Sequence, residues 1–248
     1  MPREVNVFLL PQQIQPEELR GGIAVVIDVL RASTTILAAL ANGARCVIPC
    51  GDVATARRIA ADFSRADVLL GGERGGVRID GFDLDNSPAG YTSARVSGKA
   101  IVFTTTNGTA ALLQSQAADR VLIGALVNRR AAAQELAADQ RAVHLVCAGT
   151  EGCATSEDLL TAGAIAAELE ARVGGTSSRD DLALVARDLW TAESSSGDRL
   201  RTALRQSRGG RNLVELGFDA DIDFAARVDS IQLIAEYFPK SGRIEAVR

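Results

Sequence analysis

One pattern constrains the fold of this 248-residue chain more than any other: an apolar strand, a short polar loop and an alanine-rich helix follow one another three times. The expected strands span 23–28, 100–103 and 143–147, and the helices after them span 36–42, 110–118 and 157–172. Each strand is a short, continuous apolar run, which is typical of a sheet covered by helices on both faces. Strands that alternate with helices in this way predict an α/β fold of three layers, α/β/α, with a mainly parallel sheet.

The rest of the first two thirds fits the same architecture. Shorter strands are expected at 46–49, 68–70 and 121–123, and further helices at 53–65 and 181–191. The length suits one large domain or two small ones that share a core, and we predict a single compact domain, 1–248. The recurring plan indicates an internal duplication that divides near 120–145, and 174–180 is the strongest linker candidate.

The C-terminal part is more polar. Residues 194–211 carry several arginines, and the acids between them favour a solvated helix face over a nucleic-acid patch. The pattern of 222–238 is mixed, and 230–238 fit an amphipathic helix whose apolar side chains pack on the core. A homodimer contact is the alternative for that apolar face.

Charge and the rarity of histidine narrow the chemistry. With 27 basic and 31 acidic side chains, the net charge of −4 argues against a nucleic-acid partner. The single histidine, His144, leaves no histidine cluster for zinc. Neither cysteine pair, Cys46/Cys50 or Cys147/Cys153, has the spacing of a zinc or redox motif. Because no signal peptide or membrane span is evident either, we expect a reduced, cytoplasmic protein with no membrane partner.

Polar side chains gather where the expected strands end. In open α/β sheets, ligands bind beyond the carboxyl ends of the strands. Asp28 ends a buried strand, where a carboxylate is costly unless it pairs with an arginine such as Arg31 or binds a metal. The loop 104–109 offers hydroxyls and backbone N–H groups at a helix start, which serve either as a cradle for an oxyanion or as plain helix caps.

Two further loops add acids and glycines. The sequence Gly71-Gly72-Glu73-Arg74-Gly75-Gly76 follows the strand 68–70, and its glycines permit close approach of the backbone to a ligand. The third loop ends in Ser156-Glu157-Asp158, where Ser156 can cap the helix. Its two acids either stabilise the positive end of that helix or provide a ligand for a hard cation such as Mg²⁺.

Several familiar phosphate chemistries are excluded because their motifs are missing. The chain has no P-loop and no glycine-rich dinucleotide motif after a strand. The sixth residue after Cys147 is not the arginine of a cysteine phosphatase. Leu30 stands two residues after Asp28, where phosphatases of the haloacid dehalogenase type carry a second aspartate. What remains is a carboxylate or hydroxyl site with a metal, assisted by Arg31 and Arg74.

Taken in order, the motifs resemble those of the 2-phosphosulfolactate phosphatase family over about residues 5–244. The matching stretches are Ile27-Asp28-Val29-Leu30-Arg31-Ala32-Ser33-Thr34-Thr35, Gly72-Glu73-Arg74-Gly75-Gly76, Asn86-Ser87-Pro88, Thr104-Thr105-Thr106-Asn107-Gly108-Thr109, Cys147-Ala148-Gly149 with Ser156-Glu157-Asp158, and Gly217-Phe218-Asp219-Ala220-Asp221-Ile222-Asp223-Phe224. Two departures are Asp85 in place of a glycine before Asn86, and Ser33 in place of a more usual threonine. Asp85 would place an extra acid beside the site, where it could change which metal or substrate the protein prefers.

The resemblance implies two similar, intertwined halves around a mixed sheet and a Mg²⁺-dependent phosphatase. Its substrate would be a small polyanion, 2-phospho-3-sulfolactate, which yields the 3-sulfolactate of coenzyme M biosynthesis. The expected catalytic residues are Asp28, Arg31, Glu73 and Arg74, and the expected metal ligands are Asp28, Glu73, Glu157 and Asp158. The expected substrate-binding residues are Ser33, Thr34, Asn86, Ser87, Thr105, Thr106, Asn107 and Gly108.

An acidic protein must bind such a polyanion through local positive charge. We expect Arg31 and Arg74 to clamp the phosphoryl or sulfonate group and Mg²⁺ to bridge phosphoryl oxygens. Either a metal-bound water attacks or Asp28 attacks to form an aspartyl phosphate, and the missing second aspartate favours water. Two other functions stay open: a phosphatase of another small 2-phospho-hydroxy acid, and a non-catalytic protein that binds a phosphorylated metabolite.

Overall fold

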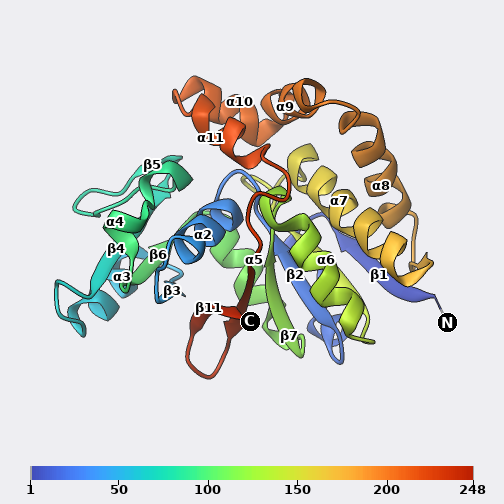
Figure 1. The fold of residues 1–248 in the computed structure, drawn as a ribbon. Helices are drawn as coiled ribbons and strands as arrows, with labels where there is room; N and C mark the ends of the chain where they lie inside the picture. Colours follow the sequence, from blue (N-terminus) through green and yellow to red (C-terminus); the bar gives the residue numbers. More distant parts are fainter. Residues whose placement is uncertain (1, 248) are drawn as a thin grey trace.

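The computed structural model describes residues 2–247 and confirms the three-layer α/β class: a mixed sheet of 11 strands lies between helices (Figure 1). The strand order is β5-β4-β6-β3-β11-β10-β7-β2-β8-β1-β9. The strands are β1 (Arg3–Phe8), β2 (Ile23–Ile27), β3 (Cys46–Pro49), β4 (Val68–Arg74), β5 (Val77–Arg78), β6 (Ala100–Thr104), β7 (Arg120–Gly124), β8 (Val143–Cys147), β9 (Thr176–Ser177), β10 (Ile234–Phe238) and β11 (Arg243–Val247). The helices are α1 (Pro16–Leu19), α2 (Ala32–Ala41), α3 (Val53–Ala61), α4 (Ser93–Val96), α5 (Gly108–Gln114), α6 (Arg129–Ala138), α7 (Ser156–Val173), α8 (Leu182–Glu193), α9 (Gly197–Gln206), α10 (Arg208–Glu215) and α11 (Asp219–Ala225). Within this part of the chain, no helix has both the length and the apolar character needed to cross a membrane.

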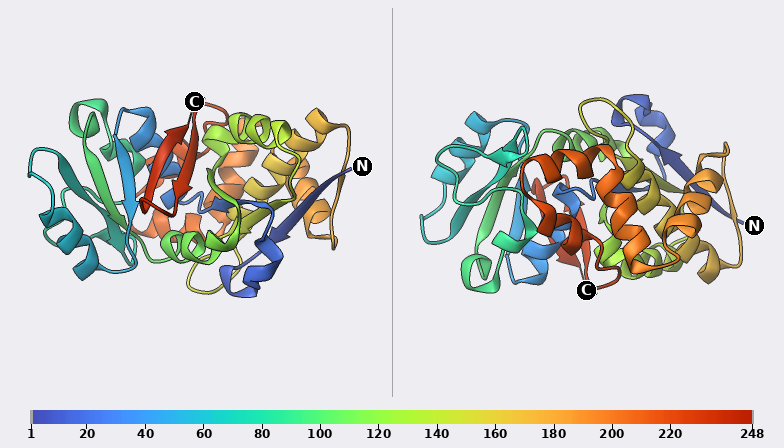
Figure 2. Two further views of the ribbon diagram at one scale, coloured as in Figure 1. Left: turned by 90° about the horizontal axis from the view of Figure 1, so that it is seen from below. Right: turned by 90° about the horizontal axis from the view of Figure 1, so that it is seen from above.

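The sheet consists of two parallel parts joined by an antiparallel hairpin. On one side β3, β4 and β6 run parallel, and on the other side β1, β2, β7 and β8 run parallel. The C-terminal hairpin β10–β11 lies between them, with β11 antiparallel to β3 and β10 antiparallel to β7 (Figure 2). The chain therefore begins in one part, builds the other, returns, and ends in the seam between the two. The proposed division near 120–145 stays a prediction.

The central strand β2 shows why its apolar run is continuous. All five of its residues are buried. Ala24 and Val26 belong to a hydrophobic cluster that includes residues of α2 and α5. Ile23, Val25 and Ile27 belong to a second cluster, which includes residues of α7 and α8. Because successive side chains of a strand point to opposite faces, a strand between two helical layers needs an apolar residue at every position.

The parallel strands direct their polar loops to one edge of the sheet. Asp28 follows β2, residues 105–107 follow β6, and residues 148–155 follow β8. Helices α9, α10 and α11 lie over this edge (Figure 1) and cross the middle of the molecule when it is seen from above (Figure 2, right). The loops and this helical module together enclose the space in which a ligand would bind.

The helix expected at 230–238 is wrong, because residues 234–238 form β10. Their burial alternates: Ala235 and Tyr237 are buried, and the residues on either side are half-buried. The apolar residues of this stretch fit a helix and a strand almost equally well, and the antiparallel partners β7 and β11 decide between them. Ile231 and Tyr237 do pack in the core, as expected.

Other elements differ at their ends or in their surroundings. The linker expected at 174–180 contains β9, which pairs with β1 at the edge of the same sheet. Helix α2 already begins at Ala32, and α3 ends at Ala61 instead of residue 65. The segment 194–211 forms α9 and the start of α10, and it is not wholly solvated, since Leu200 and Leu204 are buried.

Candidate active site

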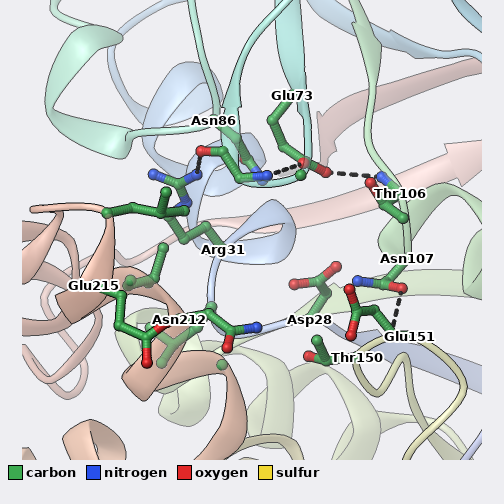
Figure 3. Close-up of a pocket in the computed structure, with 16 residues that line it drawn as sticks. Asp28, Arg31, Glu73, Asn86, Thr106, Asn107, Thr150, Glu151, Asn212 and Glu215 are labelled. Atoms are coloured by element: carbon green, nitrogen blue, oxygen red, sulfur yellow. Dashed lines mark hydrogen bonds between the residues drawn. The ribbon is translucent and has the colours of Figure 1, made fainter.

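A cavity of about 450 Å³ lies at the carboxyl edge of the sheet, and its volume falls in the range of small-molecule sites. Figure 3 shows Asn212 of α10 on one side of it and Asp28, Asn107 and Glu151, from the loops after β2, β6 and β8, on the other. The lining residues are Asp28, Leu30, Arg31, Glu73, Gly75, Gly76, Asn86, Thr106, Asn107, Thr150, Glu151, Gly209, Asn212, Leu213, Glu215 and Leu216. The cavity therefore draws residues from both parallel parts of the sheet and from the C-terminal helices.

Asp28 brings a buried carboxylate into this cavity. The backbone N–H of Ala32 donates to its Oδ1 (3.2 Å), whereas no residue in 2–247 donates a hydrogen bond to its Oδ2. Burial, reinforced by the negative charges of Glu73 and Glu157, raises the pKa of Asp28 to about 7. One oxygen of the carboxylate thus remains available to a ligand.

Gly108 makes room for that carboxylate. It is the first residue of α5 and is buried. A Cβ at this position would lie 2.7 Å from Asp28 Oδ2 and 2.8 Å from the Cβ of Ala32. The carboxylate of Asp28 therefore occupies the space that any larger residue at position 108 would need.

Arg31 is the one basic residue among those that line the cavity. Its Nη1 donates to Asp221 Oδ2 (2.7 Å), and its Nη2 donates to the carbonyl oxygen of Gly76 (2.6 Å). The ring centroid of Phe218 lies 4.3 Å from the guanidinium carbon. The peptide bond that precedes Arg31 is cis. The alternative prediction of an ion pair between Arg31 and Asp28 is wrong, because Arg31 pairs with Asp221 instead.

Glu73 connects two of the loops. Its Oε2 accepts the backbone N–H of Gly76 (2.7 Å), and its Oε1 accepts the backbone N–H of Thr106 (2.8 Å). The amide of Thr106, which was expected to contact an oxyanion, is therefore already bonded within the protein. Arg74 does not line the cavity, since its guanidinium donates to Thr104 Oγ1 (2.8 Å) and to the carbonyl oxygen of Glu73 (2.7 Å).

Glu157 and Asp158 lie behind the lining and hold its loops. The two oxygens of Asp158 accept the backbone N–H groups of Val29 (2.9 Å) and Gly149 (3.0 Å), and Glu157 Oε1 accepts that of Gly209 (3.0 Å). Burial raises the pKa of both carboxyls. These contacts tie the start of α7 to the loops after β2 and β8 and to α10.

A magnesium ion would need oxygen ligands in this cavity. Within residues 2–247, no three His, Cys, Asp or Glu side chains are grouped so that they could hold a metal. The oxygens of Glu73 and Asp158 each accept a backbone N–H there, and Glu157 Oε2 is buried without a partner but lies outside the lining. Asp28 Oδ2 accepts no hydrogen bond within the described residues, and Asn86 Oδ1 is buried without a partner. Because Mg²⁺ typically uses one or two protein carboxylates and completes its shell with water and phosphate, these donors fit an ion shared with a substrate.

The structure brings six of the predicted site residues into the cavity lining: Asp28, Arg31, Glu73, Asn86, Thr106 and Asn107. The others lie outside the lining: Ser33, Thr34, Arg74, Ser87, Thr105, Gly108, Glu157 and Asp158. Among these, the hydroxyl groups of Ser33 and Thr34 donate to backbone carbonyl oxygens, and that of Ser87 donates to Asp221. They shape the loops, and their contacts with substrate or metal stay predictions.

Sequence reasoning missed the lining residues Thr150, Glu151, Asn212 and Glu215. The arginine-rich segment was interpreted as a solvated face, although α10 begins within it. The overlooked signal is the adjacent pair Gly209-Gly210 inside a helix. A Cβ at Gly209 would lie 2.3 Å from a carboxylate oxygen of Glu157, and one at Gly210 would lie 1.8 Å from a backbone carbonyl oxygen. Glycine is required at both positions because α10 packs closely against Glu157 at the start of α7 and against the backbone of Leu204 in α9.

A sequence profile and three similar proteins share one description. A sequence profile described as 2-phosphosulpholactate phosphatase matches residues 8–239. A protein of Symbiobacterium thermophilum named "Probable 2-phosphosulfolactate phosphatase" is 45% identical over 218 residues, which cover 88% of this chain and 92% of that protein. Proteins with the same printed name from Caldicellulosiruptor saccharolyticus and Deinococcus radiodurans are 37% and 39% identical. These matches cover 94% and 95% of this chain and 96% and 93% of the two proteins.

Proposed function

The chain belongs to the 2-phosphosulfolactate phosphatase family, which makes it a phosphoric monoester hydrolase, and we propose that it hydrolyses 2-phospho-3-sulfolactate to 3-sulfolactate and phosphate with Mg²⁺. The observation that carries this proposal is the cavity in which the buried carboxylate of Asp28 keeps one oxygen available while Arg31 offers N–H donors. Metal-assisted hydrolysis of a phosphate ester needs no histidine when a carboxylate and an arginine are present.

The charges of the cavity support the requirement for a cation. Four acids line it, Asp28, Glu73, Glu151 and Glu215, against the single Arg31. The charge of Arg31 is already balanced by Asp221, and that of Glu151 is balanced by Arg208 outside the lining. A substrate that carries phosphate, carboxylate and sulfonate groups would be repelled by such a lining. A divalent cation that binds together with the substrate removes this conflict.

Asp28 would hold the Mg²⁺ through its free Oδ2, and among the other described residues of the lining Asn86 Oδ1 is a buried oxygen without a partner. When bound, the ion would offset the negative charge of the phosphoryl oxygens in the transition state. Arg31 would donate its remaining N–H groups to the phosphoryl group, and the side chains of Thr106 and Asn107 would bind the substrate from the opposite loop. We favour water as the attacking group, because Leu30 lines the cavity where a paired aspartate would stand.

The test is phosphate release from a panel of substrates, each assayed with Mg²⁺ and with a chelator. The panel contains 2-phospho-3-sulfolactate, 2-phosphoglycerate and phosphoglycolate, so that sulfonate and carboxylate compounds are compared. We expect Mg²⁺-dependent release that is fastest for the sulfonate. Faster release from a carboxylate compound would assign another substrate, and tight binding without release would make the protein a binding module.

A reduced cellular setting is part of the proposal. Cys46, Cys50, Cys147 and Cys153 are all free thiols, and three of the four are buried. Disulfides are rare in the cytoplasm, where thiols stay reduced, so free cysteines support the cytoplasmic location that we expect.

A further inference from the structure

The guanidinium of Arg31 is fixed on three sides. Asp221 and the carbonyl oxygen of Gly76 each accept one of its N–H groups, and Phe218 covers one face. The side chains of Arg31 and Asp221 are each only 2% exposed. An arginine carries five N–H donors, so these two bonds leave others that can face the cavity.

Asp221 is itself held in place from outside its own helix. It lies on α11, and its second carboxylate oxygen accepts the hydroxyl hydrogen of Ser87 (2.6 Å). Ser87 follows Asn86, which lines the cavity. Asp221 therefore links α11, the turn at 86–88 and Arg31 in one hydrogen-bonded group, in which Arg31 and Asp221 are buried and Ser87 is half-buried.

A buried ion pair is weak evidence of a stabilising role. Removing two charges from water is costly, and apolar side chains of similar volume hold elements together as well or better. The pair therefore calls for a reason besides stability, and the position of Arg31 in the cavity lining provides one. An arginine whose orientation is set before the substrate binds needs no rearrangement during the reaction.

We propose that Asp221 is a positioning residue: it aims the guanidinium of Arg31 at the phosphoryl group, with Ser87 holding its second oxygen. The inference rests on the proposed function in one respect, namely that the cavity binds a phosphoryl group. It makes α11 part of the active site, although this helix contributes no lining residue of its own.

The experiment measures the dissociation constant of inorganic phosphate by calorimetry in the presence of Mg²⁺, alongside kcat and KM for 2-phospho-3-sulfolactate. Asp221→Asn keeps the shape of the side chain and removes its charge. Since a misplacement of about 1 Å is sufficient to cost 10²-fold, we expect phosphate affinity and kcat/KM each to fall by about tenfold or more. The matched control is Asp198→Asn, because Asp198 pairs with Arg201 on the exposed face of α9, and it should leave both quantities unchanged.

A double-mutant cycle separates positioning from folding. Once Arg31→Met has removed the guanidinium, adding Asp221→Asn should not weaken phosphate binding further. Arg31→Met/Asp221→Leu should melt at or above the temperature of Arg31→Met and bind phosphate no more tightly than Arg31→Met does. If Asp221→Asn does not fold, Ser87→Ala replaces it, with a smaller loss of affinity of about threefold expected from one lost hydrogen bond.

Three outcomes would overturn the inference. The first is wild-type phosphate affinity in a folded Asp221→Asn or Ser87→Ala protein. The second is an equal loss of affinity with and without Arg31. The third is a wild-type protein that binds no phosphate at all. If the wild-type protein binds phosphate but does not hydrolyse 2-phospho-3-sulfolactate, the proposed function fails, and the binding cycle still decides the role of Asp221.

Discussion

Replacing Gly108 by alanine tests the geometry of the site with a single methyl group. The new Cβ would lie 2.7 Å from Asp28 Oδ2, whereas ordinary contact begins near 3.4 Å, so the carboxylate must retreat by about 0.7 Å. Ala32 blocks a second direction, since its Cβ would lie 2.8 Å away. Asp28 therefore moves away from the position it holds in the cavity.

The expected losses differ between activity and stability. A displacement approaching 1 Å at a reacting group costs on the order of 10²-fold, so kcat/KM should fall by roughly that factor. Overpacking lowers the free energy of unfolding by about 1–3 kcal/mol. Alanine in a helix raises it by up to about 1 kcal/mol relative to glycine. The net loss of about 0–3 kcal/mol corresponds to a decrease in Tm of up to roughly 10 °C for a chain of this size.

The assay compares phosphate release and thermal unfolding of Gly108→Ala with those of Gly51→Ala. Gly51 is the matched control because a Cβ there meets nothing within 4 Å. Gly51→Ala should behave like the wild-type protein in both measurements. If folded Gly108→Ala kept kcat/KM within twofold of the wild type, the position of Asp28 Oδ2 would not matter for the reaction, and the reasoning would be refuted.

Three further results are expected. Asp28→Asn removes the carboxylate whose Oδ2 is free, so turnover should fall on the order of 10³-fold. The circular dichroism spectrum and Tm should stay those of the wild type. Phosphate release at nearly the wild-type rate would show that the reaction does not use Asp28. Burial lowers the pKa of His144 below its usual value of about 6.5. At this residue the unfolded chain then binds more protons than the folded protein, so the contribution of His144 to stability should decline as the pH falls below about 6.5, opposite in sign to that of the buried carboxyls whose pKa is raised. Denaturant titrations should find that acidification lowers the stability of the wild-type protein relative to that of His144→Leu. An equal dependence of stability on pH in the two proteins would contradict this explanation. Cys153 is exposed, whereas the other three cysteines are buried, and burial raises the pKa of Cys50 to about 11. A thiol reagent at pH 8 should therefore modify one cysteine in the native protein and all four after unfolding. A second rapidly reacting thiol in the native protein would contradict the burial of the other three.

Elements whose residues are covered on both faces were predicted closely from the sequence. The strands expected at 46–49 and 143–147 are β3 and β8 with the same bounds. Their continuous apolar runs leave little choice, because every position faces a helical layer. The hairpin β10–β11 was missed, since half-buried residues fit two periodicities and only pairing with β7 and β3 selects one.

The site was predicted in part for a similar reason. The rule that ligands bind at the carboxyl ends of parallel strands led to Asp28, Glu73 and Asn107, and all three line the cavity. Helix α10 follows no such rule, because it reaches the cavity by packing across the sheet edge and not by following a strand. The rule therefore did not lead to its residues Asn212 and Glu215.

The sequence by itself determined the fold class, the edge of the sheet where the site lies and the family, because apolar periodicity and ordered motifs are local properties of the chain. It did not distinguish one acid from another. Glu73, Asp158 and Asp221 bond to partners 33, 129 and 190 residues away and so hold loops or an arginine. Asp28 keeps a free oxygen because folding brings it no second donor within the described chain. Tertiary structure alone decides which buried carboxylate meets a hydrogen-bond donor and which one remains for the ligand.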